Sequence, residues 1–197
     1  MVLFQFSEPS KEGIVRFLDS QRDAPFSYDE VGASREAPKE LAGYAVDHNR
    51  VKLDEGRETL NRAVAALHAW KMFDIGWARL VPEDAPVEVG TTVAVLARHY
   101  GFWSLNPCRV LYTIEDDDGS CMRRGFAYGT LPGHGERGEE RFTVEWRRGE
   151  DSVFYDLYAF SRPNSLLAKL GYPLTRRLQH RFAKDSLQAM VRATSWR

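Results

Sequence analysis

The sequence has little cysteine, no long apolar run and no excess of charge of either sign. Its 197 residues include only Cys108 and Cys121, too few for a disulfide framework or a four-ligand zinc site. No apolar stretch approaches the roughly 18 residues of a membrane-spanning helix, and the first residues lack the basic region of a secretory signal. Lys and Arg number 27 against 28 Asp and Glu, which disfavours nucleic acid as a partner. We therefore expect a soluble cytoplasmic protein with reduced thiols and no transmembrane segment.

Several motifs of catalysis and metal binding are also absent. The G-x-S-x-G and H-E-x-x-H patterns do not occur. His134-Gly135-Glu136 resembles the start of the zinc-deaminase motif, but no P-C-x-x-C follows it. Residues 133–138 fit G-x-G-x-x-G, yet a strand is predicted after them instead of the helix that a dinucleotide site needs. The sequence therefore predicts no metal and no cofactor.

What the sequence does contain is a series of strands in its middle part. The strands are rich in β-branched and aromatic residues, turn residues separate them, and they cover 91–100, 109–115, 122–131, 141–147 and 153–161. Phe142, Val144 and Trp146 alternate with polar residues, as in a half-buried strand. Short connections join antiparallel neighbours, so the pattern predicts an antiparallel meander.

Helical patterns flank this meander. Ser7 or Ser10 is expected to cap a short helix, an irregular loop follows at 23–41, and a strand at 44–53 precedes a helix at 56–73. The fold class is therefore α+β: an antiparallel sheet against a long C-terminal helix, with an additional N-terminal helix and loop. We expect a single domain over 1–197, in which 1–43 is the extension and 44–197 the core.

The C-terminal helix is expected to begin at Asn164 or Ser165 and to be kinked or divided at Gly171-Tyr172-Pro173. From Arg162 onward the sequence has eight Lys and Arg but one acid, Asp185. That segment carries about +7 against about −8 on the rest. Such a basic helix docks on an acidic body or contacts an anionic surface.

The strand at 124–130 has two very different faces. One carries Phe126 and Tyr128, and the other carries only Gly125, Ala127 and Gly129. A strand face without large side chains leaves space above the sheet. Either another segment packs close to this face, or a cavity opens there.

These residues carry a resemblance to known proteins. The segments 125–134 and 138–142 resemble the signature of an uncharacterised bacterial and plant family, catalogued as a domain of unknown function. Residues 47–51, 70–73, 101–103 and 160–163 resemble its other blocks. More distantly, the order of elements resembles the START-like helix-grip superfamily of lipid carriers and polyketide cyclases. That resemblance implies a curved sheet that wraps the last helix and encloses an apolar cavity.

The first functional hypothesis is a binding protein for a hydrophobic or amphipathic small molecule. The glycine face would form the floor of the cavity, and the helix from Leu166 onward would form its lid. A surplus of Trp and Tyr suits a largely apolar pocket with a few polar groups. The candidate ligand-binding residues are His48, Arg50, Trp103, Arg109, Gly125, Ala127, Tyr128 and Gly129.

The alternatives belong to other classes. An enzyme such as a cyclase, hydrolase or isomerase of an apolar substrate would need an acid or base in the cavity, and His134, Glu136 and Glu139 are the candidates. Weak contact of the basic helix with an anionic surface is a third hypothesis. Association with a second copy of the chain stays open. On the strand hairpin we also expect an exposed ladder of ion pairs that joins Arg124 and Arg141 to Glu139, Glu145 or both.

Overall fold

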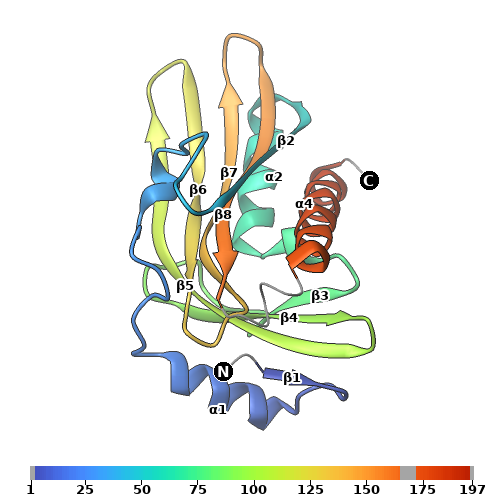
Figure 1. The fold of residues 1–197 in the computed structure, drawn as a ribbon. Coiled ribbons are helices and arrows are strands. Elements are labelled where there is room, and N and C mark those ends of the chain that lie inside the picture. The colour runs from blue at the N-terminus through green and yellow to red at the C-terminus, as the bar shows by residue number, and fades with distance from the viewer. Residues whose placement is uncertain (1–2, 165–171, 196–197) are drawn as a thin grey trace.

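The computed structural model describes residues 3–164 and 172–195, and one curled antiparallel sheet dominates it (Figure 1). The strands of these residues are β1 (Leu3–Gln5), β2 (Ala45–Glu55), β3 (Ala78–Val81), β4 (Thr92–His99), β5 (Phe102–Asp117), β6 (Cys121–Thr130), β7 (Glu136–Arg147) and β8 (Ser152–Pro163). Their order in the sheet is β2-β8-β7-β6-β5-β4-β3, and β1 pairs with β5. Strands β4 to β8 are therefore the predicted meander.

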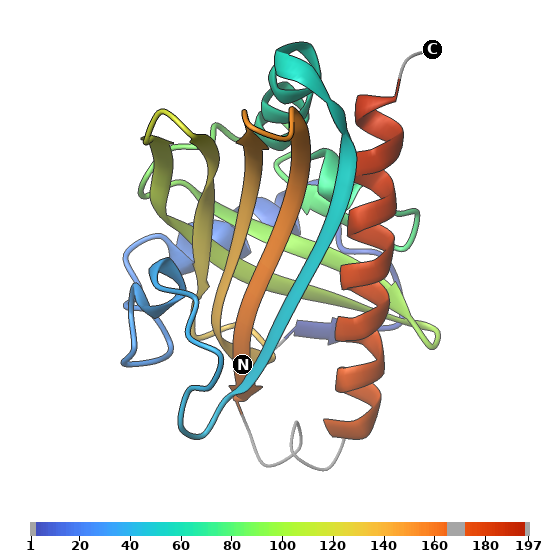
Figure 2. The same cartoon turned by 90° about the horizontal axis from the view of Figure 1, so that it is seen from above.

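Helices cover both faces of the sheet. The long helix α4 (Tyr172–Thr194) and helix α2 (Gly56–His68) lie on the concave face, where α4 runs alongside β2 and β8 (Figure 2). Helix α1 (Lys11–Gln21) packs on the opposite side, against β4 and β5. Two short 3-10 turns, η1 (Ala33–Arg35) and η2 (Lys71–Phe73), complete the fold. The predicted fold class is confirmed.

Local chemistry explains where several elements begin. The Ser10 side chain accepts a hydrogen bond from the Gly13 N–H and so caps α1. Strand β5 begins at Phe102, earlier than predicted, because Tyr100 (φ 50°) and Gly101 (φ 82°) form a tight turn after β4. Strand β7 begins at Glu136, so the second half of the segment 133–138 is strand.

Helix α4 runs uninterrupted over the described residues from Tyr172 onward. Pro173 lies in its first turn, where the missing N–H of a proline costs nothing. The segment 165–171, on which the predicted helix start and part of the predicted lid fall, lies outside the described residues. Asn164 binds the turn between β6 and β7, and its side-chain amide donates to the His134 carbonyl at 2.7 Å.

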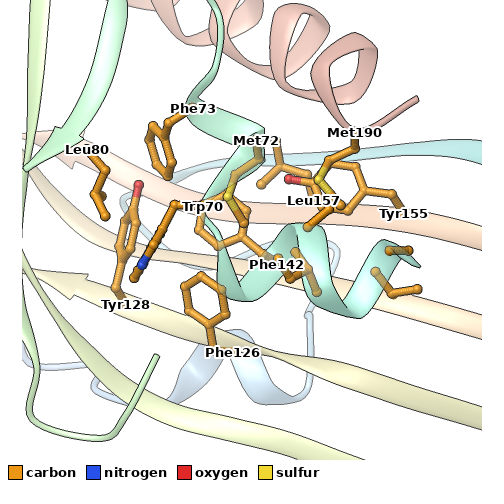
Figure 3. Packing of buried hydrophobic residues seen from close by; sticks show 14 of the residues in the cluster. Trp70, Met72, Phe73, Leu80, Phe126, Tyr128, Phe142, Tyr155, Leu157 and Met190 are labelled. Carbon is orange, nitrogen blue, oxygen red and sulfur yellow. The ribbon is translucent and has the colours of Figure 1, made fainter. Parts of the chain in front are cut away.

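The concave face holds the main core. Aromatic rings from η2, from Trp70 just before it and from the central strands meet there, with centroids 4.7 Å apart for Trp70 and Phe126 and 5.2 Å apart for Phe126 and Phe142 (Figure 3). Tyr155 and Met190 extend the cluster to α4. Burial of these large side chains fixes α2 and α4 on this face.

The segment between α1 and β2 covers part of the outer face of the sheet. Tyr28 from this segment packs so close to Gly129 that a Cβ there would lie 2.1 Å from the tyrosine oxygen. Tyr28 also packs edge-on against Phe160, with centroids 5.9 Å apart. Of the two alternatives for the glycine face of β6, close packing is therefore the correct one.

Candidate functional site

A cavity of about 820 Å³ lies between the concave face of the sheet and α4. Its walls are mostly apolar, and the larger side chains among them are Phe73, Trp77, Val95, Leu157, Leu178 and Phe182. A volume of this size lies within the usual range of small-molecule sites. Polar groups from β2, from strands β4 to β8 and from α4 interrupt these walls.

Glu136 is the least satisfied polar group of this cavity. Its residue is 8% exposed, and neither carboxylate oxygen has a hydrogen-bond partner among the described residues. Burial raises the pKa of Glu136 to about 7, although Ser161, Arg176 and Gln179 nearby lower it in part. The Gln179 side chain instead donates to the Ser161 hydroxyl at 2.8 Å. Glu136 is therefore a carboxyl group that holds or releases a proton near neutral pH.

His134 lies next to Glu136 on the turn that leads into β7. Its Nδ1 accepts a hydrogen bond of 2.8 Å from the Glu136 backbone N–H. Burial lowers the pKa of His134 to about 4, so the ring is neutral at neutral pH. A neutral ring that accepts at Nδ1 carries its proton on Nε2.

Tyr128 and Glu140 form a second polar pair in the cavity, opposite each other on β6 and β7. The Tyr128 hydroxyl donates to the Glu140 carboxylate at 2.5 Å. Burial raises the pKa of Glu140 to about 7, and the tyrosine hydrogen bond offsets part of that rise. Burial and the nearby carboxylate raise the pKa of Tyr128 well above its usual value.

An ion pair connects α4 to the edge of the sheet beside this cavity. Arg176 of α4 donates to both carboxylate oxygens of Asp47 on β2, at 2.5 and 2.7 Å. It also donates to the Gln179 side chain at 2.7 Å. The bidentate geometry holds the beginning of α4 against β2.

The opposite wall of the cavity comes from β4 and β5. There Asn106 donates to the Ser104 hydroxyl at 3.0 Å. The Nδ1 atom of His99 is buried and has no partner among the described residues. Burial lowers the pKa of His99, so this wall adds neutral polar groups only.

The structure brings four of the predicted site residues to the cavity wall, namely Tyr128, His134, Glu136 and Glu139. The carboxylate of Glu139 nevertheless projects to the outer face, where it accepts hydrogen bonds from the Tyr28 hydroxyl at 2.8 Å and from the Ser34 N–H at 3.0 Å, as well as from Gly32. This carboxylate fastens the segment before β2 to the sheet and does not face the cavity.

His48 and Arg50 also lie on the outer face, because Asp47 and Asn49 are the β2 residues that face the cavity. His48 Nε2 is 2.7 Å from Asp156, and the Arg50 guanidinium is 2.6 Å from Glu145. These residues belong to a surface network of ion pairs and not to the cavity.

The remaining candidates hold the fold together on the outer side. Arg109 donates to the carbonyls of Gln21 at 2.8 Å and Ala24 at 2.9 Å, and so caps the C-terminal end of α1. Trp103 packs in the small cluster beneath α1.

The predicted cavity floor of Gly125, Ala127 and Gly129 is wrong. The large residues of β6 face inward and fill the core, and the glycine face admits Tyr28 from outside. At Gly125 a Cβ would lie 2.1 Å from the Phe142 carbonyl oxygen, so this position is also closed by backbone.

The predicted ladder of ion pairs is also different from the observed one. Arg123, one residue before Arg124, lies opposite Glu145. Glu145 is surrounded by Arg50, Arg123 and Arg147, with contacts from 2.6 to 3.3 Å. Its side chain is only 10% exposed, so these are not the exposed pairs that were expected. Arg141 pairs instead with Asp156 at 3.2 Å.

Sequence reasoning missed Glu140, Asp47 and Gln179 as cavity residues. A signal was present for Glu140, because it shares a strand face with Phe142 and Val144. A carboxylate in line with buried apolar residues is unusual and marks a polar group in the interior. Nothing in the sequence indicated that Asp47 and Gln179 meet the cavity from two distant elements.

Other features bear on the class of site. Among residues 3–164 and 172–195, no group of three His, Cys, Asp or Glu is arranged to hold a metal ion. Cys108 and Cys121 are both buried and unpaired.

Among the described residues, no helix is long and apolar enough to cross a membrane. On α4, Arg181 lies 3.4 Å from Asp185, and Arg192 donates to the Asp74 carbonyl at 3.1 Å, so part of its basic side is engaged within the protein.

The curled antiparallel sheet, the long C-terminal helix against it and the cavity between them define a helix-grip α+β protein. The chain belongs to the family described as "Domain of unknown function (DUF1990)", which matches residues 27–189. The predicted family is thus confirmed.

Relatives of similar length resemble this chain in sequence over almost its whole length. The chain is 37% identical to a UPF0548 protein of Dictyostelium discoideum, over 97% of this chain and 95% of that one. It is 31% identical to a UPF0548 protein of Arabidopsis thaliana, over 98% of both.

Solved structures share the fold at low identity. A hypothetical protein of Helicobacter pylori superposes with a TM-score of 0.52 at 12% identity, over 80% of this chain and 91% of that one. Norcoclaurine synthase from Thalictrum flavum, in complex with dopamine and hydroxybenzaldehyde, has a TM-score of 0.43 at 12% identity, over 78% of this chain and 90% of that one.

Proposed function

We propose that this protein binds a hydrophobic or amphipathic small molecule in the cavity between the sheet and α4. The observation that carries the proposal is a volume of about 820 Å³ with apolar walls and a few buried polar groups. The atoms that line an unfilled apolar volume lack van der Waals partners on one side, and this lowers stability. A bound apolar molecule would restore those contacts.

Two measurements on the full chain test the proposal. Native mass spectrometry of the purified protein would detect a molecule that stays bound during purification. Titration with the neutral fluorescent probe N-phenyl-1-naphthylamine would report binding in an apolar site. We expect saturable binding of one probe molecule per chain.

A cavity-filling substitution locates the probe. Ala159 lines the cavity on β8, and Ala159→Phe would occupy part of it. We expect this variant to lower probe affinity by about tenfold or more. The matched control is Ala193→Phe, at an exposed position of α4. If neither a co-purified molecule nor probe binding is found in the wild type, the proposal fails.

A second candidate is an enzyme that acts on the bound molecule, such as a cyclase, hydrolase or isomerase. Its support is the pairing of Glu136, whose pKa is raised by burial to about 7, with the neutral His134 beside it. A carboxyl group with a pKa near the working pH is suited to give and take a proton. Incubation of wild-type protein and Glu136→Gln with the same metabolite extract would test this. A compound consumed by the wild type alone supports catalysis, and equal extracts contradict it.

A further inference from the structure

The charged side chains that face the cavity are all of one sign. Asp47, Glu136 and Glu140 present carboxylates there, Glu139 lines the cavity with its carboxylate turned to the outer face, and none of the described lining residues is Lys or Arg. Asp47 is already paired with Arg176, and Glu140 already accepts the Tyr128 hydroxyl. Glu136 has two buried oxygens with no described partner, and the nearby Ser161 and Gln179 side chains are bonded to each other. The cavity therefore offers a hydrogen-bond acceptor whose polar neighbours are already engaged.

The histidines do not supply a positive charge. Burial lowers the pKa of His134 to about 4, and it also lowers the pKa of His99. Both rings are therefore neutral at neutral pH. The cation near Glu136 is Arg176, whose guanidinium is already paired with both oxygens of Asp47. An anionic group in this cavity would therefore lose its hydration without an unshared cation to compensate it, and would also be repelled by the carboxylates.

The lining of the cavity changes from polar to apolar in the same direction along β8 and along α4. Along β8 the residues on the cavity side change from Ser161 to Ala159 to Leu157, which spans about 13 Å at the rise of an antiparallel strand. Along α4 the same direction leads from Gln179, which is bonded to Ser161, to Phe182. Asp47 and Glu140 lie beside Ala159 on the neighbouring strands, but both carboxylates are already paired. The unpaired acceptor thus lies at the Ser161 end of the cavity, and large apolar side chains lie toward Leu157 and Phe182.

We propose that the ligand is an apolar molecule with a hydrogen-bond donor at one end, an amine or a hydroxyl group, which binds the carboxylate of Glu136, and that molecules ending in a carboxylate, phosphate or sulfate are rejected. This inference rests on the proposed binding function of the cavity. The apolar part of the ligand lies along Ala159 and Leu157 toward Phe182. A donor at Glu136 replaces the hydrogen bonds that the buried oxygens lack within the described structure.

Three probes with the same tail and different ends test this inference. Octylamine, octan-1-ol and octanoate would each displace N-phenyl-1-naphthylamine from the full-length protein at neutral pH. We expect octylamine to bind best, octanol next, and octanoate at least about tenfold more weakly than octylamine. The tail contributes equally to all three, so the order reports the end group alone.

Substitution of the acceptor completes the experiment. We expect Glu136→Gln to lower the affinity for octylamine by about tenfold and to raise the affinity for octanoate, with a smaller change for octanol. The control Glu58→Gln, at an exposed position of α2, should change none of them. Far-UV circular dichroism and the urea midpoint of Glu136→Gln show whether the variant is folded.

The possible failures are distinct. Equal binding of the three probes, or tighter binding of octanoate, overturns the donor-end inference and leaves the binding function intact. An unchanged order in Glu136→Gln shows that another group selects the ligand, which also overturns the inference. If the wild type neither binds the fluorescent probe nor carries a co-purified molecule, the binding function fails and the inference fails with it.

Discussion

The backbone N–H of Glu136 donates a hydrogen bond to Nδ1 of His134, two residues earlier in the chain, at 2.8 Å. This contact places the proton of the neutral ring on Nε2, and burial lowers the pKa of His134 to about 4. We predict that His134 stays in the Nε2–H form between about pH 5 and 8. Nitrogen-15 NMR of the imidazole rings measures this directly, and His134→Gln assigns the signal. A titration near 6.5, the ordinary value for histidine, would contradict it.

Glu136 gives a second prediction, for stability against pH. Burial raises its pKa to about 7, above the value of about 4.3 in an unfolded chain. Between these values the folded state binds a proton that the unfolded state has released, so stability falls as pH rises. Glu136→Gln lacks this fall, and its stability relative to wild type should grow by on the order of 1–2 kcal/mol from pH 5 to pH 7.5.

Urea denaturation of both proteins at the two pH values measures that difference. Glu58→Gln, exposed on α2, is the matched control for the loss of a carboxylate. A stability difference for Glu136→Gln that is constant with pH would show that the Glu136 carboxyl is ionised throughout.

Glu145 on the outer face should show the opposite dependence. Burial raises the pKa of Glu145, but hydrogen bonds from Arg50 and Arg147 outweigh this and lower it to about 2. The Glu145 carboxylate therefore stabilises the fold fully at pH values above its pKa in the unfolded chain, and this stabilisation is lost as pH falls toward 2. We predict that Glu145→Gln costs about 1–2 kcal/mol at pH 7, since the arginines are partly exposed, and less at pH 3. Urea denaturation of both proteins at both pH values measures this loss of stability. An equal loss at pH 7 and pH 3 would mean that the charge of Glu145 does not stabilise the fold.

Glu139 should matter for structure and not for binding. Its two oxygens accept from three donors, on Tyr28, Gly32 and Ser34. The NH₂ group of a glutamine would face one of these donors, so Glu139→Gln should lower stability by about 1.5–3 kcal/mol.

The same substitution should speed trypsin cleavage after Arg35 and leave affinity for N-phenyl-1-naphthylamine within about twofold of wild type, which is under 0.5 kcal/mol. Glu36→Gln, an exposed neighbour, is the control for both measurements. If Glu139→Gln lost probe binding but kept the stability of the wild type, the Glu139 side chain would belong to the candidate site.

The fold was predictable because its signals are local. The alternation of Phe142, Val144 and Trp146 and the short turns between strands fix an antiparallel meander. The inward face of β6 was not predictable in this way. Alternation separates Gly129 from Tyr128, but the residue that covers Gly129 is Tyr28, about one hundred positions earlier.

The candidate site was predictable only in part for a related reason. His134 and Glu136 were singled out by their chemistry, and both line the cavity. Glu139 has the same chemistry as Glu140, yet one residue along a strand separates the outer face from the inner one. The sequence pattern predicted the strand from 141, five residues late, so the faces of these glutamates were not assigned.

The position of Trp77 has a practical consequence. Its indole lines the cavity, its N–H donates to Asp185 at 2.8 Å, and the Arg181 guanidinium lies 4.8 Å from its ring centre. It is the one tryptophan among the described lining residues. Indole fluorescence changes with local polarity and with nearby charges. The intrinsic fluorescence of Trp77 therefore reports whether the cavity is occupied, so that unlabelled protein can be screened against colourless compounds.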